Sequence, residues 1–527
     1  MGLATRYPEL CTLLQLYHNE SDFDIEWKPF MESISNDVEV VYVYGFNPHV
    51  DPLIQWLDAD CKRDLVFIET QVSVLKKIER DDCGQILNHP QIHLKVFFGD
   101  TSLEEFIEGV IREFPFEKIQ VFFASNEVKK LLFRKATLEF AIHAEMLQYH
   151  FLAKNLIRNF RRLSLAFEPS LWKDKFKDVP AIVCGAGPSL KDVAEKLKGL
   201  EEKALLFAGG SAIPALTSLG IIPHLLFAID PNPEEFTRLA FHSAYNTPLI
   251  FGCRLEPNVF YAHAGPIGYL PTGTGGPLEE WMEERLGIHD YKVLEGLGEE
   301  ALSVTAITFM SAVYLGCNPI ILAGVDLSYD DGKRYSDGVI SDLQCQMEEC
   351  PKKASESLWR DGDVDTITKW LMERDVLDEV AKNNQDKIFL KASAKGLSFE
   401  NIFTSQDFDQ NISGGINLRE KIESLILSTS LKVDGNAVEA NLEIFFQSIK
   451  KCQEIVTKFE SADQITMQAI LEMDLEEELA YQIALKQAVY ALTFQVRREY
   501  RTSEFHLIKK AVFKRVQWII DEYLKLC

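Results

Sequence analysis

Short apolar segments alternate with helical stretches along most of this 527-residue chain, and that alternation restricts its fold more than any other feature. Between residues 1 and 160 the apolar segments are VEVVYVYGF (38–46), DLVFIET (64–70), IHLKVFFGD (92–100) and IQVFFASN (119–126). Apolar strands that alternate with helices form parallel sheets that are covered on both faces. The pattern therefore predicts an α/β fold built on parallel sheets.

The same pattern divides the chain into three predicted domains, because one hydrophobic core rarely supports 527 residues. An N-terminal α/β domain covers residues 1–160, and a central domain covers residues 165–410. The central strands are expected at 181–185, 204–209, 224–230, 249–253, 319–326 and 387–393. Residues 415–527 have no strand pattern and show helical spacing, for example at Leu471, Leu475, Leu479 and Ile483. We expect a helical C-terminal domain there, with a structural or oligomeric role.

The N-terminal domain has the outline of a Rossmann-like methyltransferase domain. Glu69 ends its second strand, where a working cofactor site would use an acid to hold ribose hydroxyls. The first turn reads Gly45-Phe46-Asn47-Pro48-His49, with one glycine where a dinucleotide or SAM loop needs two or three. We therefore expect this domain to be a scaffold without a cofactor.

Composition and termini argue against several classes of protein. The formal net charge of −25 argues against general nucleic-acid binding. No apolar stretch approaches the roughly 20 residues of a membrane helix, and the N-terminus lacks the regions of a signal peptide. Ten cysteines without a pairing pattern fit a reducing cytoplasm, where we expect the protein. Cys345 and Cys350 have the spacing of half a zinc site, but no second pair or histidine follows, so no metal is expected.

The strongest local motif is PAIVCGAGPSLKDVAEKLKGL (180–200), in which an apolar strand enters a glycine loop and then an amphipathic helix. Gly185 and Gly187 allow tight turning and close approach of the backbone to a ligand. Pro188 suits a helix start, and Ser189 is expected to cap that helix. The N–H groups of the loop and the helix dipole make a phosphate site. The alternative is a plain strand-to-helix turn.

Three further polar loops follow later strands of the central domain. They are FAGGSA (207–212), FAIDPNP (227–233) and AGVDLSY (323–329). In an open parallel sheet, the loops that follow the strands share one edge, and ligands bind at that edge. Four polar loops at one edge predict a nucleotide site.

The segment from Pro180 to about Tyr335 resembles the motility-associated factor (Maf) family of flagellin glycosyltransferases. The resemblance lies in GAGPSL (185–190), AGGSAIPALTSLGIIPHLLFAIDPNP (208–233), SVTAITFMSAVYLGCNPIILAGVDLSY (303–329) and, more weakly, KIFLKASAKGL (387–397). The family's central domain is similar to bacterial sialyltransferases, which hold CMP with a GNGPSL-type loop, and is shared with MptE-like 6-hydroxymethylpterin diphosphokinases. The resemblance implies transfer of a nonulosonic sugar, such as pseudaminic or legionaminic acid, from a CMP donor to a protein Ser/Thr acceptor. That acceptor would be flagellin-like or another surface protein.

The resemblance also implies roles for residues of the central domain. The nucleotide phosphate and ribose would be held by Gly185, Ala186, Gly187, Pro188 and Ser189. The cytidine or sugar pocket and the donor hydroxyls would contact Gly210, Ser211, Asp230 and Asn232, and a helix facing the donor would be capped by Ser303 and Thr305. Asp326 is the candidate base or donor-binding carboxylate, and Tyr329 and Tyr335 are candidates to bind the departing phosphate. Structural alternatives stay open: Asp230 as the anchor of the Asp-Pro turn, Asp326 as a satisfied strand-end acid, and Ser303 as an N-cap alone.

The chain departs from the sialyltransferase pattern at the catalytic base. Those enzymes place a histidine after the strand that matches 319–326, whereas His506 is the one histidine that follows His289 here. His224 and His263 are expected to be structural, because their neighbours are apolar. A carboxylate can activate an acceptor hydroxyl if its pKa is suitable.

Three functional hypotheses stay open. The first is a CMP-sugar glycosyltransferase that needs no tightly bound cofactor. The second is a pterin diphosphokinase that uses Mg²⁺-ATP, with Asp230 and Asp326 as metal ligands. The third is an inactive scaffold or interaction protein.

Overall fold

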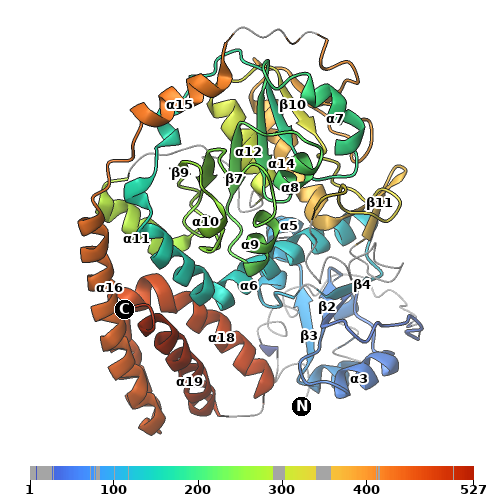
Figure 1. The fold of residues 1–527 in the computed structure, drawn as a ribbon. Coiled ribbons are helices and arrows are strands. Elements are labelled where there is room, and N and C mark those ends of the chain that lie inside the picture. The colour runs from blue at the N-terminus through green and yellow to red at the C-terminus, as the bar shows by residue number, and fades with distance from the viewer. Residues whose placement is uncertain are drawn as a thin grey trace. The chain divides into compact units, whose positions relative to one another are not determined.

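The computed structural model describes residues 7–8, 27, 29–71, 73–75, 78, 83–99, 101–116, 118–288, 303–339, 358–410, 412, 416–501 and 504–527. They form two compact units, Met1–Leu147 with Tyr490–Val512, and Gln148–Val489 with Phe513–Cys527. Each unit contains a parallel sheet, and the C-terminal region is helical, which confirms the predicted α/β class (Figure 1). The boundaries of the three predicted domains stay predictions.

The first unit contains a four-stranded parallel sheet in the order β3-β2-β1-β4. Its strands are β1 (Val40–Tyr44), β2 (Asp64–Glu69), β3 (Ile92–Val96) and β4 (Ile119–Phe122). Its helices are α3 (Asp51–Asp58), η1 (Cys83–Asn88), α5 (Leu103–Arg112) and the first part of α6 (Asn126–Phe160). The start of α5 is fixed by a reciprocal capping box between Ser102 and Glu105. All four strands predicted in this region are present.

The second unit contains an eight-stranded sheet in the order β14-β13-β10-β5-β6-β7-β8-β9, with every pair parallel. The six predicted strands are β5 (Ala181–Cys184), β6 (Leu205–Gly209), β7 (Leu225–Ala228), β8 (Leu249–Phe251), β10 (Ile320–Ala323) and β13 (Phe389–Lys391). Two further strands at the edges, β9 (Ile267–Tyr269) and β14 (Phe403–Thr404), were not predicted. The strand order reverses between β5 and β10, which makes this the switch point of the sheet.

Helices cover both faces of this sheet. The helices between its strands are α7 (Leu190–Lys198), α8 (Ala212–Ser218), α9 (Pro233–Leu239), α10 (Val259–Ala262), α12 (Val304–Tyr314) and α14 (Thr368–Asn383), while α11 (Gly276–Leu286) packs against α16 (Gly435–Lys458). Apolar side chains of α12 and α14 pack against alternate strand residues such as Val183, Phe207 and Leu322 in one core cluster. This two-residue alternation is what a sheet buried on both faces requires.

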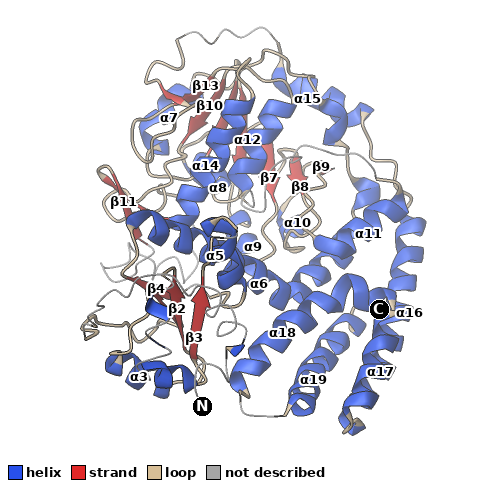
Figure 2. Ribbon diagram, turned by 180° about the vertical axis from the view of Figure 1, so that it is seen from behind, coloured by secondary structure: helices blue, strands red, loops and turns tan. Residues whose placement is uncertain are grey.

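The remaining described elements are mostly helical. They are η2 (Leu163–Leu165), η3 (Pro169–Trp172), the hairpin of β11 (Leu358–Asp361) and β12 (Val364–Ile367), α15 (Leu418–Ser428), α16 (Gly435–Lys458), η4 (Phe459–Ser461), α17 (Ile465–Glu476), the π-helical turn η5 (Tyr481–Leu485), α18 (Lys486–Glu499) and α19 (Phe505–Leu524). Figure 2 shows α16 to α19 without an accompanying strand. Within the described parts of the chain, no helix combines the length and apolar character needed to span a membrane.

Candidate functional site

The glycine loop, residues 185–189, follows β5 and lies directly against the loop that follows β10. Gly185 N donates to Ala323 O at 2.8 Å, and Gly187 N donates to Gly324 O at 2.8 Å. A Cβ at position 185 would lie 2.4 Å from Gly324 O, so no side chain fits there. The two loops at the switch point are therefore fixed to each other by backbone contacts.

Asp326 completes this connection through Ser189. Ser189 is fully buried and Asp326 is 3% exposed. Ser189 N donates to Asp326 Oδ2 at 2.8 Å, and the Ser189 hydroxyl donates to Oδ1. Burial raises the pKa of Asp326, whereas the bonds from Ser189 lower it. The sequence predicted that Ser189 caps α7, but its side chain makes no capping bond, and the carboxylate of Asp326 binds its amide instead.

A buried lysine supports the same loop from the neighbouring strand. Lys391, at the end of β13, is 3% exposed and its Nζ donates to Leu397 O at 2.7 Å. Leu397 N in turn donates to Asp326 O at 2.8 Å. Burial lowers the pKa of Lys391 to about 8, and the charge of Asp326 opposes that change. Both carboxylate oxygens of Asp326 thus have hydrogen-bond partners within the protein, which agrees with the structural alternative for this residue. Its predicted role in catalysis or donor binding stays a prediction.

The loop after β7 holds Asp230 and Asn232 together. Asn232 donates to Asp230 Oδ1 from its backbone N at 3.0 Å and from Nδ2 at 2.8 Å. Arg238 Nη1, from α9, lies 3.1 Å from Asp230 Oδ2. Asp230 therefore anchors its own turn and also forms an ion pair.

Glu235 and Arg238 were missed by the sequence analysis. Glu235 is 1% exposed, and its Oε2 lies 3.2 Å from Arg238 Nη1. Its Oε1 is buried without a hydrogen-bond partner. Burial raises the pKa of Glu235 to about 7, with a further rise from Asp230 and an opposing effect of Arg238. The one sequence signal was an acid and an arginine three residues apart on the helix that follows the polar loop.

The loop after β6 contacts two of these elements. A Cβ built on Gly210 would lie 3.6 Å from Glu235 Oε1, and the φ of Gly210 is +48°. A Cβ built on Gly209 would overlap Val304 at 2.1 Å, so a glycine is needed where β6 meets the start of α12. Ser211 is half-buried at the N-cap position of α8. The loop after β6 therefore lies close to α12 at Gly209 and close to α9 at Gly210.

Ser303 caps α12, as predicted from its position. Its Oγ accepts from Ala306 N at 2.9 Å and donates to Glu373 Oε1 at 2.7 Å. Thr305 also bonds to Glu373, a carboxyl group whose pKa is raised by burial and lowered by these hydroxyls and by Lys369 and Arg334. Whether this helix faces a donor stays a prediction.

The two predicted tyrosines lie in different surroundings. Tyr329 is 9% exposed and packs on Trp370, with ring centroids 4.8 Å apart. Tyr335 carries the Arg334 guanidinium 5.0 Å from its ring centroid and contributes to the electrostatic environment of Arg238. Ser336 N, one residue on, donates to Ala186 O at 2.7 Å. Tyr335 therefore belongs with the glycine loop and α9, whereas Tyr329 is packed against α14.

The histidines expected to be structural lie away from these loops. His224 precedes β7, and its Nδ1 accepts from Leu206 N at 3.0 Å. Burial lowers its pKa to about 3. His263 precedes β9, and burial lowers its pKa to about 4. Both therefore flank the amino ends of strands, opposite the loops that carry the predicted site.

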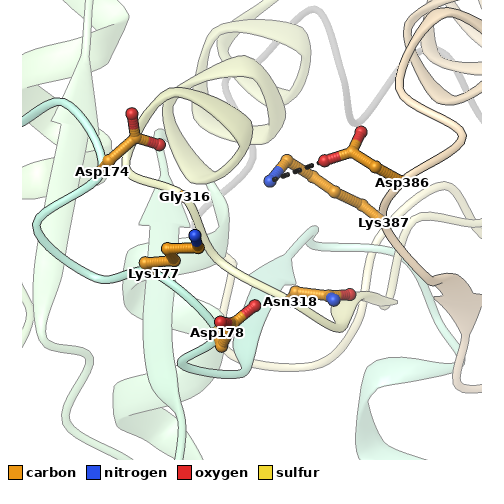
Figure 3. Close-up of a pocket in the computed structure, with 7 residues that line it drawn as sticks. All are labelled: Asp174, Lys177, Asp178, Gly316, Asn318, Asp386 and Lys387. Atoms are coloured by element: carbon orange, nitrogen blue, oxygen red, sulfur yellow. Dashed lines mark ion pairs between the residues drawn. The ribbon is translucent and has the colours of Figure 1, made fainter.

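A surface pocket of about 330 Å³ also lies at the amino ends of the strands (Figure 3). Its lining includes Asp178 before β5, Asn318 before β10 and Lys387 before β13. Asn318 Oδ1 accepts from Ile388 N at 2.9 Å, so this side chain holds the chain at the entry to β13. None of the predicted site residues lines this pocket.

In the first unit, both carboxylate oxygens of Glu69 accept hydrogen bonds from backbone N–H groups. Its Oε2 accepts from Phe46 N at 2.8 Å, and its Oε1 accepts from Thr70 N at 2.8 Å and Gln71 N at 2.7 Å. Both carboxylate oxygens that would meet a ribose are therefore bonded within the protein. Cys345 and Cys350 lie outside the described residues, and no group of three or more metal-ligating side chains suited to a metal ion occurs among the residues that are described.

Comparisons relate part of the chain to known proteins. Residues 154–332 match the family model described as 6-hydroxymethylpterin diphosphokinase MptE-like. No curated protein matches the chain significantly. Among solved structures, the chain is similar to a Maf glycosyltransferase from Magnetospirillum magneticum AMB-1, with a TM-score of 0.48 and 16% identity over 93% of this chain and 79% of that chain.

The matched family segment runs from the last turns of α6 through β10. It contains the glycine loop and the loops after β6, β7 and β10, while Tyr335 and Glu373 lie beyond it. The likeness to the MptE-like family therefore covers residues 154–332 of this chain.

Proposed function

We propose that this chain is a glycosyltransferase that transfers a nonulosonic, sialic-acid-like sugar from a CMP donor to a Ser or Thr hydroxyl of a protein acceptor. The observation that carries the proposal is the grouping of four polar loops at the carboxyl edge of one parallel sheet, two of them at its switch point. Nucleotides bind at this place in open α/β sheets. We infer the CMP-sugar donor from the glycine loop and from its resemblance in sequence to Maf proteins.

The residues at this edge offer groups for binding and for proton transfer. Arg238 and Arg334 supply positive charge for an anionic donor. The proton of the acceptor hydroxyl needs a base, and the histidine of the sialyltransferases has no counterpart in sequence. Glu373 is a candidate for that base, because burial raises the pKa of its carboxyl group.

The description of the matched family favours a second candidate, a pterin diphosphokinase. That reaction would use Asp230 and Asp326 to hold Mg²⁺. Both oxygens of Asp326 accept from Ser189, and Asp230 is bonded to Asn232 and Arg238. Partners within the protein therefore already bind both carboxylates, which favours the CMP-sugar reaction over one that needs them as metal ligands.

Nucleotide binding tests the proposal directly. We would measure CMP, UMP, ADP and ATP binding by calorimetry, with and without Mg²⁺, for the wild type, Asn232→Ala and Glu234→Ala. Both side chains are exposed, Asn232 at the N-cap position of α9 and Glu234 in its first turn, and Asn232 alone has a predicted ligand contact, so Glu234→Ala is the matched control. We expect a metal-independent preference for CMP that weakens about tenfold or more in Asn232→Ala alone. Preference for Mg²⁺-ATP would instead indicate the diphosphokinase, and no binding would indicate an inactive scaffold.

A further inference from the structure

One guanidinium group of the candidate site, that of Arg238, forms ion pairs with two carboxyl groups. Arg238 Nη1 lies 3.1 Å from Asp230 Oδ2 and 3.2 Å from Glu235 Oε2. Asp230 comes from the loop after β7 and Glu235 from the first turn of α9. With both acids ionised, two negative charges share one positive charge, and the cluster carries a net charge of −1.

Glu235 is the member of this cluster that is poorly placed to stay ionised. It is 1% exposed, whereas the side chain of Asp230 is 27% exposed. Its Oε1 has no hydrogen-bond partner and faces Gly210. An ionised oxygen in such a place is costly, so a bound proton lowers the free energy. The charged and titratable groups near it are Asp230, Arg238 and, beside Arg238, Tyr335.

The cluster also lies close to the glycine loop. Tyr335 contributes to the electrostatic environment of Arg238, and the next residue, Ser336, donates from its backbone N to Ala186 O at 2.7 Å. A donor held by the glycine loop would bring its phosphate and its sugar carboxylate toward a cluster of net negative charge. Like charges repel at this range, so binding favours the state of the cluster that carries less negative charge.

We propose that Glu235 takes up one proton from solvent when the anionic donor binds, and that this removes one of the two carboxylate charges beside Arg238, so that its guanidinium can face the donor's phosphate or carboxylate. Glu235 is then a positioning residue that acts through Arg238. The inference rests on the proposed CMP-sugar function and adds a group that sets its pH dependence. It also follows that donor affinity is highest below about pH 7, where the unliganded carboxyl already holds its proton.

Proton uptake can be measured apart from catalysis. We would titrate the full chain with CMP-N-acetylneuraminic acid in buffers of different ionisation enthalpy, from about pH 5.5 to about pH 8.5. This probe carries a phosphodiester and a carboxylate that do not titrate in the range, so any uptake belongs to the protein. We expect almost no uptake at the acid end, rising toward one proton per bound donor above neutrality. Affinity should fall by up to about tenfold per pH unit above pH 7.

Two variants of the cluster identify the group. Glu235→Gln keeps an oxygen for Arg238 but carries no charge, so it should bind the probe with no uptake and with affinity independent of pH. Asp230→Asn, on the same guanidinium, should keep the uptake and move it to lower pH, because the neighbouring charge that raises the pKa of Glu235 is gone. Wild-type binding without uptake, or unchanged uptake in Glu235→Gln, overturns this inference alone. Absence of probe binding at every pH overturns the proposed function and this inference together.

Discussion

Position 187 needs a glycine because a carboxylate of the protein itself lies next to it. A Cβ at this position would lie 2.6 Å from Asp326 Oδ2 and 2.7 Å from Gly324 O. Both atoms belong to the loop after β10, and Asp326 is held in place by Ser189. The glycine therefore permits the close approach of two protein loops.

Gly187→Ala should lower the free energy of unfolding by about 1–3 kcal/mol, because the added methyl group displaces Asp326 or Gly324. Gly199→Ala is the matched control at the other end of α7, where the nearest atom would lie 3.4 Å from the new Cβ and the φ is −71°. That change should alter stability by less than about 1 kcal/mol. Chemical denaturation measures both, and equal effects would refute the explanation given for Gly187.

Glu279 shows how a buried acid makes stability depend on pH. It is 1% exposed, accepts from Gly275 N at 2.9 Å and lies 3.3 Å from the Tyr269 hydroxyl. Burial raises the pKa of Glu279, and the charge of Glu283 adds to the rise. The folded state therefore keeps a proton at a pH where the unfolded chain has lost it. Stability falls as pH rises from the carboxyl's ordinary pKa toward its folded value.

Glu279→Gln should remove this loss, since the amide keeps an acceptor for Gly275 N and has no charge to desolvate. We expect its free energy of unfolding to exceed that of the wild type by roughly 1–3 kcal/mol at about pH 8 and by much less at about pH 5. Glu280→Gln, at an exposed position of the same helix, is the control and should follow the wild type at both values. A gain that does not change with pH would contradict the titration of Glu279.

At the scale of elements, two asparagines on α6 hold the loops beside the candidate site. Asn155 Nδ2 donates to Pro231 O at 2.9 Å and to Arg254 O at 3.2 Å. Asn159, one turn later, donates to Cys253 O at 2.9 Å and Leu255 O at 2.7 Å. Asn155 thus reaches the loop of Asp230 and Asn232, whereas Asn159 binds only the loop after β8.

Asn155→Ala and Asn159→Ala should each cost about 1–3 kcal/mol of stability, because buried carbonyl groups lose their donors. Only Asn155→Ala should also weaken CMP binding, since Pro231 lies between Asp230 and Asn232. Denaturation and nucleotide titration of the two variants separate these effects. An equal loss of CMP affinity in both would mean that the loop after β7 has no special part in binding.

The sequence predicts elements where the signal is local and misses those where it is not. Six strands of the second unit were predicted from runs of apolar residues. By contrast, β9 reads IGY between Pro266 and Pro271 and β14 consists of two exposed residues, so neither forms an apolar run. The Asp326–Ser189 pair joins residues 137 positions apart, and only the adjacency of β5 and β10 brings them together. Glu235 resembles any acid in a first helical turn until its burial is known.

At the scale of the whole molecule, the chain leaves its first unit and returns to it. Residues Tyr490–Val512 belong with Met1–Leu147, although more than 300 residues separate them in sequence. Their main polar connection is to Asp64, at the start of β2, which is 2% exposed. Arg501 Nη2 lies 2.8 Å from Asp64 Oδ2, Arg498 Nη2 lies 3.3 Å from it, and His93 Nε2 lies 2.8 Å from Oδ1. The returning segment thus balances a charge that the first 147 residues bury.

Replacing Arg498 and Arg501 with alanine should therefore destabilise the first unit by about 3–5 kcal/mol, because the buried carboxylate of Asp64 loses both arginine partners. Phe116 also loses the Arg498 guanidinium, whose Cζ lies 3.7 Å from the centroid of its ring. Hydrogen exchange should rise in β1 and β2 and stay at the wild-type rate in β5, β6 and β7. Arg497→Ala, exposed in the same helix, is the control and should leave exchange unchanged. Adding Asp64→Asn to the double variant should restore part of the protection, because the unpaired charge is then gone. Unchanged exchange in β1 and β2 would mean that the first unit holds its sheet without the returning segment, and the chain's return would need another explanation.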